Sequence, residues 1–441
     1  MLPLDYVHAV CLAGVAVYIW QREPPRLLLT PLMLISFFVL YGAGNIIYFA
    51  GADTVPEVHR AVTLSLILMW FCIVIGMEFA RACMPVRTAR AAQVIRDWKA
   101  TRVADRSHAD QLLAALGILV ALFILGMFLY LGKPSQLHNF FSFDLTQDKT
   151  RYRADFSGGG GYVYQILVAS VAAFVSFLLL ARGIAARKRH LVAIGLLVCI
   201  AVLAGKLGTF QKIPWLIYIL QLMIVFQATR SLDVGIRRIV LLSIVVLAGA
   251  IVAVRIAIPD LDPAGIFEFL GYRFFQVNNE VIYQTFYVYP RYLPHTWGMN
   301  IGLIHSVFGN GELLSAYSRV ASFFGSEGAT FDTFFIGDAW VDFSYGGVLV
   351  MSLVVGFVVK GIDVFVMSLG KTPLCLALLG SGMYGLFELQ VTSAFTAALT
   401  GGLVFIPLLA SGSAGLVNDL YRGMRERGNR EGGPGQASSP S

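Results

Sequence analysis

Long apolar runs, separated by short polar segments, recur from the first residues of the chain to about residue 413. A run of roughly 17–25 apolar residues can cross a bilayer as a helix, which satisfies its own backbone hydrogen bonds in lipid. The pattern therefore predicts about eleven membrane-spanning helices. They are expected at Leu4–Trp20, Leu28–Ala50, Ala61–Phe79, Gln111–Leu131, Tyr162–Leu180, Leu191–Ala204, Pro214–Gln227, Ile239–Ala257, Tyr345–Val366, Pro373–Leu389 and Thr396–Ser413.

The longest polar interruption, Ile258–Phe343, falls between the eighth and ninth of these helices. It divides the chain into residues 1–257 with the first helices, 258–344 as a large loop with amphipathic or re-entrant helices, 345–413 with the last helices, and 414–441 as a tail. The tail is rich in glycine, arginine and serine, which is typical of disorder. A large loop on a rigid helical scaffold is where binding and catalytic residues are expected.

Composition supports the membrane assignment. Hydrophobic residues make up 57% of the chain and charged residues 13%, with a mean hydropathy of +0.73, whereas soluble domains carry about 25% charged residues. The predicted fold class is an all-α polytopic membrane protein. The five cysteines lack the spacing of a zinc site or a disulfide framework. No nucleic-acid-binding motif accompanies the net charge of +7, so nucleic acid is not an expected partner.

The basic residues predict the orientation, because cytoplasmic loops are enriched in lysine and arginine. Most of the 33 basic residues lie in the segments Gln21–Arg26, Arg81–Asp110, Ala181–His190 and Ala228–Arg238, in the tail, and at Lys360 and Lys371. These parts are therefore expected in the cytoplasm. The N-terminus and the large loop are expected on the outer side.

A minority of basic residues falls on the predicted outer side, where it opposes the topological trend. The candidates among them are Arg151, Arg153, Lys206, Lys212, Arg255, Arg273 and Arg291. Arginine offers a planar fork of N–H groups to phosphate oxygens, and lysine offers a compact charge. These residues are candidates for binding an anionic substrate. The alternative is that their side chains extend to lipid headgroups.

The large loop begins with a predicted amphipathic helix, Gly265–Tyr289, which could lie along the membrane surface. The polar residues expected on one face are Arg273, Gln276, Glu280 and Gln284. Arg273 could hold a diphosphate and Glu280 could act as a base. Alternatively, both side chains are simply solvated.

The loop ends in Phe331–Gly347, which runs into the ninth helix. Asp338 and Asp342 are four residues apart and share a helical face, where like charges are mildly unfavourable. Their presence indicates a cationic partner or contacts with sugar hydroxyls, and Trp340 offers a ring on which a sugar could stack. A cap for the following helix is the alternative.

Two further residues are candidates on chemical grounds. Glu388 lies near the outer end of the tenth helix, and an ionisable residue within a membrane span is a functional candidate. His295 lies in the large loop and could carry a proton near neutral pH.

With these features the chain resembles bacterial oligosaccharide repeat-unit polymerases of the O-antigen polymerase (Wzy) family. The resemblance covers most of the chain and rests on the many helices, the Lys206–Lys212 hairpin, the loop with Arg273, and the segment Gly337–Gly347 that enters a late helix. It implies a GT-C-like glycosyltransferase in the bacterial inner membrane. It also implies that a glycan passes, on the outer face, from undecaprenyl diphosphate to another lipid-linked repeat unit.

The resemblance further implies a reaction without metal or other cofactor, in which arginine and lysine stabilise the departing diphosphate. The implied partners are undecaprenyl-diphosphate-linked oligosaccharide and membrane lipids, with a chain-length regulator and a flippase as further candidates. In the related O-antigen ligases, arginine and histidine residues on the outer face are important. This carries over to Arg151, Arg273, Arg291 and His295.

The acceptor hydroxyl needs a base, for which Asp338, Glu280 and His295 are candidates. Asp338 ranks above Glu280 because it lies beside Trp340. Two alternative functions remain open: an O-antigen ligase, with the same chemistry and another acceptor, and a flippase for lipid-linked oligosaccharides. A transporter would place its charges along a path at mid-membrane. The concentration of charges toward one face favours an enzyme.

Overall fold

The computed structural model describes residues 2–104, 110–131, 164, 166–207, 212–233, 248–249, 251–252, 255, 262–301, 305, 316–325 and 334–412. Across these ranges the named elements are all helices, and β pairing is limited to an isolated bridge between Arg26 and Asp233. Eight helical segments are long and apolar enough to cross a membrane. The described part of the chain therefore confirms the prediction of an all-α protein with several membrane-crossing helices.

These eight segments coincide with eight of the predicted spans. They are α1 (Pro3–Arg22), α2 (Leu29–Phe37) with the π-helical turn η1 (Phe38–Ala43) and α3 (Gly44–Gly51), α4 (Pro56–Cys83), α6 (Asp110–Leu131), η3 (Leu167–Val171) with α10 (Ala172–Ala185), α11 (Arg189–Leu207), α18 (Phe335–Ser368) and α19 (Pro373–Val391). Prolines begin α1, α4 and α19. Proline is well tolerated there because the first N–H groups of a helix have no partner within it.

Two other predicted spans have different outcomes. α12 (Lys212–Arg230) is a helix over the segment predicted at Pro214–Gln227, but it is not among the eight segments of membrane-spanning character. The segment predicted at Ile239–Ala257 lies almost entirely outside the described residues, as does most of the hairpin that follows Leu207.

The last predicted span, Thr396–Ser413, is not one continuous helix. α20 (Ala394–Leu399) begins at Ser393, whose hydroxyl accepts a hydrogen bond from Thr396 N over 3.0 Å. The chain then turns at a pair of glycines, where Gly402 has a φ of +73°, and is helical again at 405–412. Because the segment is apolar on both sides of the turn, its composition did not indicate the break.

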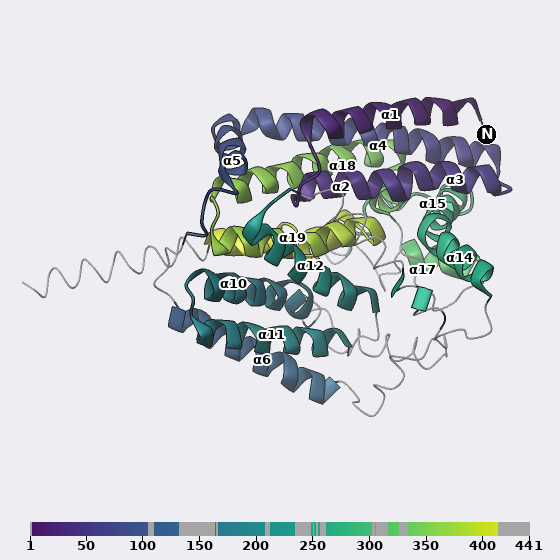
Figure 1. The fold of residues 1–441 in the computed structure, drawn as a ribbon. Coiled ribbons are helices and arrows are strands. Elements are labelled where there is room, and N and C mark those ends of the chain that lie inside the picture. The colour runs from purple at the N-terminus through teal and green to yellow at the C-terminus, as the bar shows by residue number, and fades with distance from the viewer. Residues whose placement is uncertain are drawn as a thin grey trace, which may run out of the picture.

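The long helices run side by side in two groups (Figure 1). α1, α2, α4 and α18 form one group, and α6, α10 and α11 form the other. α19 joins them, because it contacts α2 and α18 as well as α10 and α12. Buried apolar side chains from both groups belong to one continuous cluster, so the two groups share a core.

α4 and α18 share the most extensive helix contact in the described structure. Glycines on both helices make the close approach possible. A Cβ added to Gly76 would lie 2.2 Å from Leu353 O, and one added to Gly356 would lie 2.2 Å from Ile73 O. The two backbones therefore touch directly at this crossing, as small residues allow in membrane helix pairs.

The two ends of the bundle carry different elements (Figure 1). The α5 end holds α5 (Pro85–Asp97), the α1–α2 link and the α18–α19 link. The α15 end holds the starts of α1, α4 and α18, together with α14 (Pro263–Gly271), η4 (Tyr272–Gln276), α15 (Val277–Val288) and α17 (Ala316–Phe323). The described parts of the predicted cytoplasmic loops and of the large outer loop thus lie at opposite ends.

α18 contains a sharp kink near the α15 end. Phe343 has φ −138° and ψ 18°, and Ser344 has φ 55° and ψ −144°, so a short helix at 335–342 is set at an angle to the long helix that follows. A Cβ at Gly347 would lie 2.1 Å from Ala339 O. Only glycine therefore allows the short helix to fold so closely against the start of the long one.

Candidate functional site

The two carboxylates predicted on one helical face lie in the short helix at the start of α18. Asp338 and Asp342 are buried, with 6% and 4% of their surface exposed. Asn300 Nδ2 donates a hydrogen bond to Asp338 Oδ1 over 2.9 Å. Asp342 Oδ1 accepts hydrogen bonds from the Thr296 hydroxyl, from Gly298 N at 3.1 Å and from Asn300 N at 3.4 Å. Asp342 therefore anchors the segment that follows α15, and Asn300 contacts both carboxylates.

That segment also caps the short helix. Thr296 N donates to Val341 O over 3.0 Å, and Trp297 N donates to Asp342 O over 3.1 Å. The last carbonyl groups of a helix have no partner within it, so these bonds compensate for the kink. The alternative expected from the sequence, that the aspartates cap the helix that follows, is not what these bonds show, because the described contacts of both carboxylates go to residues 296–300. The same bonds fix the backbone next to His295.

His295 is half-buried, and its Nδ1 lies 3.2 Å from Val341 O. A carbonyl oxygen only accepts hydrogen bonds, so this contact places the proton of the neutral imidazole on Nδ1 and leaves Nε2 as an acceptor. Within the described part of the chain, Nε2 has no hydrogen-bond partner. An imidazole held in this way is suited to accept a proton from a substrate.

Trp340 is buried among the protein's own aromatic rings. Its Nε1 donates to Tyr289 O over 2.9 Å. Its ring stacks on Phe286 with 4.2 Å between centres and meets Tyr345 and His295 edge-on at 4.9 and 5.8 Å. With 5% of its surface exposed, Trp340 is not the open sugar-stacking surface expected from the sequence. It supports the position of His295 instead.

Arg319, on α17, adds an exposed cation that the sequence pattern did not single out. Its charge acts on the hydroxyl of Tyr289, which has no hydrogen-bond partner within the described residues. Burial raises the pKa of Tyr289 and the nearby Asp342 raises it further, while Arg319 opposes both effects. Arg319 therefore lies close to the carboxylate cluster. Its sequence context is that of an ordinary exposed helix, so no signal distinguished it.

The predicted helix Gly265–Tyr289 consists of α14, η4 and α15. The π-helical turn η4 has a different periodicity from an α-helix, so the predicted common face is interrupted at Arg273 and Gln276. Arg273 is exposed, and its guanidinium carbon lies 6.0 Å from the centre of the Phe269 ring. No ion pair holds Arg273 within the described ranges.

Glu280 lies beyond the π-helical turn and accepts two hydrogen bonds from its own helix. The Tyr272 hydroxyl donates over 2.9 Å and Gln284 Nε2 donates over 3.2 Å. Burial and the bond to Glu280 raise the pKa of Tyr272. Both carboxylate oxygens of Glu280 are engaged, which makes it less available as a base than His295.

Arg291 is exposed just after α15. Its guanidinium carbon lies 5.5 Å from the ring centre of Tyr287 and 5.9 Å from that of Tyr292. The two tyrosines hydrogen bond to each other over 3.0 Å. Two aromatic rings therefore pack beside Arg291 at the surface of the α15 end, and no carboxylate pairs with it within the described residues.

Lys206 and Glu388 are brought together, although 182 positions separate them in the chain. Lys206 Nζ, at the end of α11, lies 4.5 Å from the centre of the Tyr384 ring on α19 and 5.9 Å from that of Tyr218. Tyr384 and Glu388 interact electrostatically, and Glu388 Oε2 accepts a hydrogen bond from the Thr392 hydroxyl over 3.2 Å. The charges of Lys206 and Glu388 interact electrostatically. They form a second buried charged group near the same end of the bundle.

The remaining predicted residues contribute less. Arg151 and Arg153 lie outside the described residues. Lys212 begins α12, and the described structure covers its backbone but not its side chain. Arg255 is helical and exposed. Among the described residues, no hydrogen bond or ion pair connects Arg273 or Glu280 to the carboxylate cluster.

No group of three or more His, Cys, Asp or Glu side chains in the described ranges is arranged to hold a metal ion. Comparison of the chain with protein-family models, with curated proteins and with solved structures gives no match. The case for a function therefore depends on the site itself. At the α15 end, that site consists of an oriented imidazole, two buried carboxylates and several exposed arginines.

Proposed function

We propose that the chain is a polymerase of lipid-linked oligosaccharide repeat units with its active site at the α15 end. The observation that carries the proposal is the cluster of His295, Asp338 and Asp342 at the end that also presents Arg273, Arg291 and Arg319. A glycosyl transfer with a lipid diphosphate leaving group needs a proton acceptor and cations. The undecaprenyl carrier and the bacterial inner membrane follow from the resemblance to the O-antigen polymerase family.

In the proposed reaction, an acceptor sugar hydroxyl attacks the anomeric carbon of the donor. The new C–O bond forms as the bond to the diphosphate breaks, and the electron pair of that bond leaves with the lipid diphosphate. His295 Nε2 takes the proton of the hydroxyl, and the exposed arginines bind the negative charge of the diphosphate. The proton then returns to solvent, so the reaction needs no oxidant or reductant.

The structure changes the ranking of the candidate bases. Asp338 ranked first from the sequence, but it is 6% exposed and is held by Asn300. His295 is half-buried and has an oriented nitrogen with a lone pair. We therefore assign the proton acceptor to His295. Asp338 and Asp342 then position the loop that carries His295, through their hydrogen bonds with Asn300, Thr296 and Gly298.

The placement of charges supports an enzyme over a transporter. Buried charged side chains in the described ranges lie within about two to three turns of a helix end. They are Asp5, His8, Glu23, His59, Arg182, Lys206, Asp338, Asp342, Lys360, Asp363, Lys371 and Glu388. A transporter places such groups along a path at mid-membrane. The buried charges of the described ranges lie instead at both ends of the bundle, with Asp5, His8, His59, Lys206, Asp338, Asp342 and Glu388 at the α15 end and the rest at the α5 end.

A reconstitution experiment tests this function. Purified protein in liposomes is incubated with an undecaprenyl-diphosphate-linked repeat unit, and the products are separated by chain length. A ladder of longer lipid-linked products is expected from the wild type and not from His295→Ala. Substrate that remains single while protein and membrane are intact would contradict the proposal.

The same preparation separates the alternatives. Transfer to lipid A-core, without a ladder, would identify a ligase. Movement of an intact fluorescent lipid-linked unit across the bilayer, without any new glycosidic bond, would identify a flippase. Labelling of a cysteine placed at the exposed Trp297 by a membrane-impermeant reagent in intact cells tests the proposed outer position of the α15 end.

A further inference from the structure

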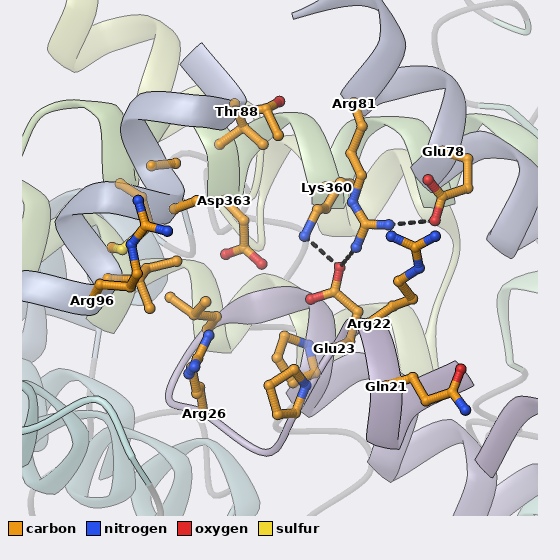
Figure 2. A pocket seen from close by; sticks show the side chains of 18 residues that line it. Gln21, Arg22, Glu23, Arg26, Glu78, Arg81, Thr88, Arg96, Lys360 and Asp363 are labelled. Carbon is orange, nitrogen blue, oxygen red and sulfur yellow. Dashed lines mark hydrogen bonds and ion pairs between the residues drawn. The ribbon is translucent and has the colours of Figure 1, made fainter. Parts of the chain in front are cut away.

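A cavity of about 450 Å³ opens at the α5 end of the bundle, opposite the proposed active site. Its walls come from the α1–α2 link, α4, α5 and α18 (Figure 2). This volume falls within the roughly 300–1,000 Å³ of ligand pockets. Five cationic and three acidic side chains line the cavity, so it is positive. The charged residues are Arg22, Arg26, Arg81, Arg96 and Lys360, and Glu23, Glu78 and Asp363.

The acidic side chains are already satisfied by the protein. Glu23 is 4% exposed and forms ion pairs with both Arg81 and Lys360, while Arg81 also pairs with Glu78 (Figure 2). A buried carboxylate needs such partners to remain ionised. These four residues therefore form a structural network that ties the ends of α1, α4 and α18 together.

Asp363 has a structural role of its own. Its two oxygens accept hydrogen bonds from Leu29 N at 2.9 Å and from Thr30 N at 2.7 Å. These are N–H groups of the first turn of α2, which lack partners within the helix. The cavity thus has no carboxylate to spare for neutralising its remaining arginines.

Three arginines are left with little or no compensation. Within the described residues, Arg22 and Arg96 have neither an ion-pair nor a hydrogen-bond partner. Arg26 lies 3.6 Å from Asp233, whose other oxygen is held by Lys99 at 2.8 Å. Arg26 and Arg96 reach the cavity from one side and Arg22 from another (Figure 2). Arg22 and Arg26 come from the end of α1 and the link that follows it, and Arg96 comes from α5.

A polar atom of the wall is also unpartnered. The Thr88 hydroxyl, on α5, is buried and has no hydrogen-bond partner within the described part of the chain. A buried hydroxyl without a partner costs free energy. This hydroxyl has no accessible surface, so the groups that a ligand in the cavity reaches are the N–H groups of the exposed Arg22 and Arg96, where it would replace water.

We infer that this cavity binds a phosphate-bearing anion, held by Arg22, Arg26 and Arg96. Arginine matches phosphate oxygens with two parallel N–H groups, and arginine is the preferred residue for such recognition. The shared chemistry is a phosphate ester, which a lipid headgroup or a soluble metabolite could provide. The inference does not depend on the polymerase proposal, because it concerns the other end of the molecule.

The surroundings favour a lipid as the source. Trp20, beside Arg22, is 79% exposed, and Phe79, between Glu78 and Arg81, is 55% exposed. Exposed tryptophan next to arginine is typical of the level of lipid headgroups. Basic pockets between membrane helices on the cytoplasmic side bind anionic headgroups. The cavity therefore lies where a phosphate at the head of a lipid could enter it.

Native mass spectrometry of the full-length protein in detergent tests the inference. The protein is titrated with phosphatidylglycerol, with phosphatidylcholine, and with phosphatidylglycerol in the presence of inorganic phosphate. The test variant is Arg22→Gln/Arg96→Gln. The matched control is Arg102→Gln/Arg189→Gln, which removes the same charge from arginines that do not line the cavity.

The wild type and the control should bind phosphatidylglycerol at least about tenfold more tightly than the test variant. The reason is that each hydrogen bond to a charged group contributes about tenfold or more to the affinity. Phosphatidylcholine should bind weakly to all three proteins. A different result is that inorganic phosphate at millimolar concentration displaces phosphatidylglycerol only from the proteins that retain both arginines. That result would support the phosphate site and identify a soluble phosphate compound as its ligand. Equal binding by test variant and wild type, or an equal loss in the control, would overturn the inference.

A conservative variant separates misfolding from lost recognition. Arg22→Lys/Arg96→Lys keeps the charge and the packing length but removes the planar fork. An affinity between those of the wild type and the glutamine variant is expected. Wild-type affinity in the lysine variant would mean that the cavity attracts anions in general and does not recognise phosphate.

Discussion

Lys206 and Glu388 lie on different helices and meet around the ring and hydroxyl of Tyr384, with Lys206 Nζ 4.5 Å from the ring centre. Removing one charge leaves the other buried. Lys206→Met should therefore lower the free energy of unfolding by about 2 kcal/mol or more. The thermal unfolding midpoint in detergent measures this loss. The double variant Lys206→Met/Glu388→Gln should recover much of it, and equal losses in the single and double variants would show that the two charges are not coupled.

The assignment of His295 predicts different outcomes for two substitutions in the same cluster. His295→Ala should abolish the product ladder with little change in the unfolding midpoint, because the half-buried ring is the proposed proton acceptor. Asp338→Asn keeps the shape of the side chain and its contact with Asn300. It should slow polymerisation about 10- to 100-fold, the range for loss of a group that orients a functional residue and does not itself react. Full activity in His295→Ala would return Asp338 to first place.

Arg273 is exposed and is free of ion pairs in the described structure. Arg273→Ala should weaken donor binding by about 1.5–3 kcal/mol, the value of a hydrogen bond to a charged group. The expression level and the unfolding midpoint of the Arg273→Ala variant should equal those of the wild type. Arg273→Lys should recover only part of the binding, because the planar fork is lost. Measurement of KM for the lipid-linked donor decides the matter, and a wild-type KM in Arg273→Ala would exclude this residue from the site.

Ser344 has a φ of +55° with a ψ of −144°, a conformation that favours glycine. Ser344→Gly should therefore stabilise the protein, by about 1 kcal/mol after the greater freedom of glycine in the unfolded chain is subtracted. Ser344→Ala is the matched control and should give no gain. A higher unfolding midpoint for the glycine variant alone is the expected result. Destabilisation by glycine would mean that the serine side chain holds the kink.

Asp233 predicts a small dependence of stability on pH at the α5 end. Its hydrogen bond to Lys99, together with the charges of Lys99 and Arg26, lowers the pKa of its carboxyl group. The stabilisation is present above the unfolded pKa of about 3.9 and is lost as the pH falls through the lower folded pKa. Asp233→Asn should thus lower the unfolding midpoint at pH 7 more than at pH 3. Because the pair is exposed, added salt should reduce the difference.

The helical fold was predictable because length and hydropathy govern membrane helices, although α4 begins at Pro56 and not at the predicted Ala61. The kink at Phe343 and Ser344 was not, since the apolar pattern continues through it. The π-helical turn at Arg273 was missed for a similar reason. An extra residue in one turn leaves the composition unchanged but shifts every side chain that follows it.

The site was predictable in part. The spacing of Asp338 and Asp342 indicated a common face, and both do lie together near His295. Their contact with Asn300 depends on how the loop returns to α18, which no local pattern encodes. Trp340 shows why part of the site was not predictable. The sequence around an aromatic residue beside a loop does not indicate whether its ring faces a substrate or the protein core. The pairing of Lys206 with Glu388 likewise depends on tertiary contact.

Gly76 packs against the backbone of α18 and Gly356 against that of α4, which joins the two helices into one pair that reaches both ends of the protein (Figure 1). One end of this helix pair carries Asp338 and Asp342, and the other end carries Arg81 and Lys360 of the arginine-lined cavity. A methyl group at either glycine would push the helices apart, because the nearest backbone oxygens lie only 2.2 Å away. The close packing of the two helices that reach both ends of the bundle therefore depends on the absence of two side chains between them.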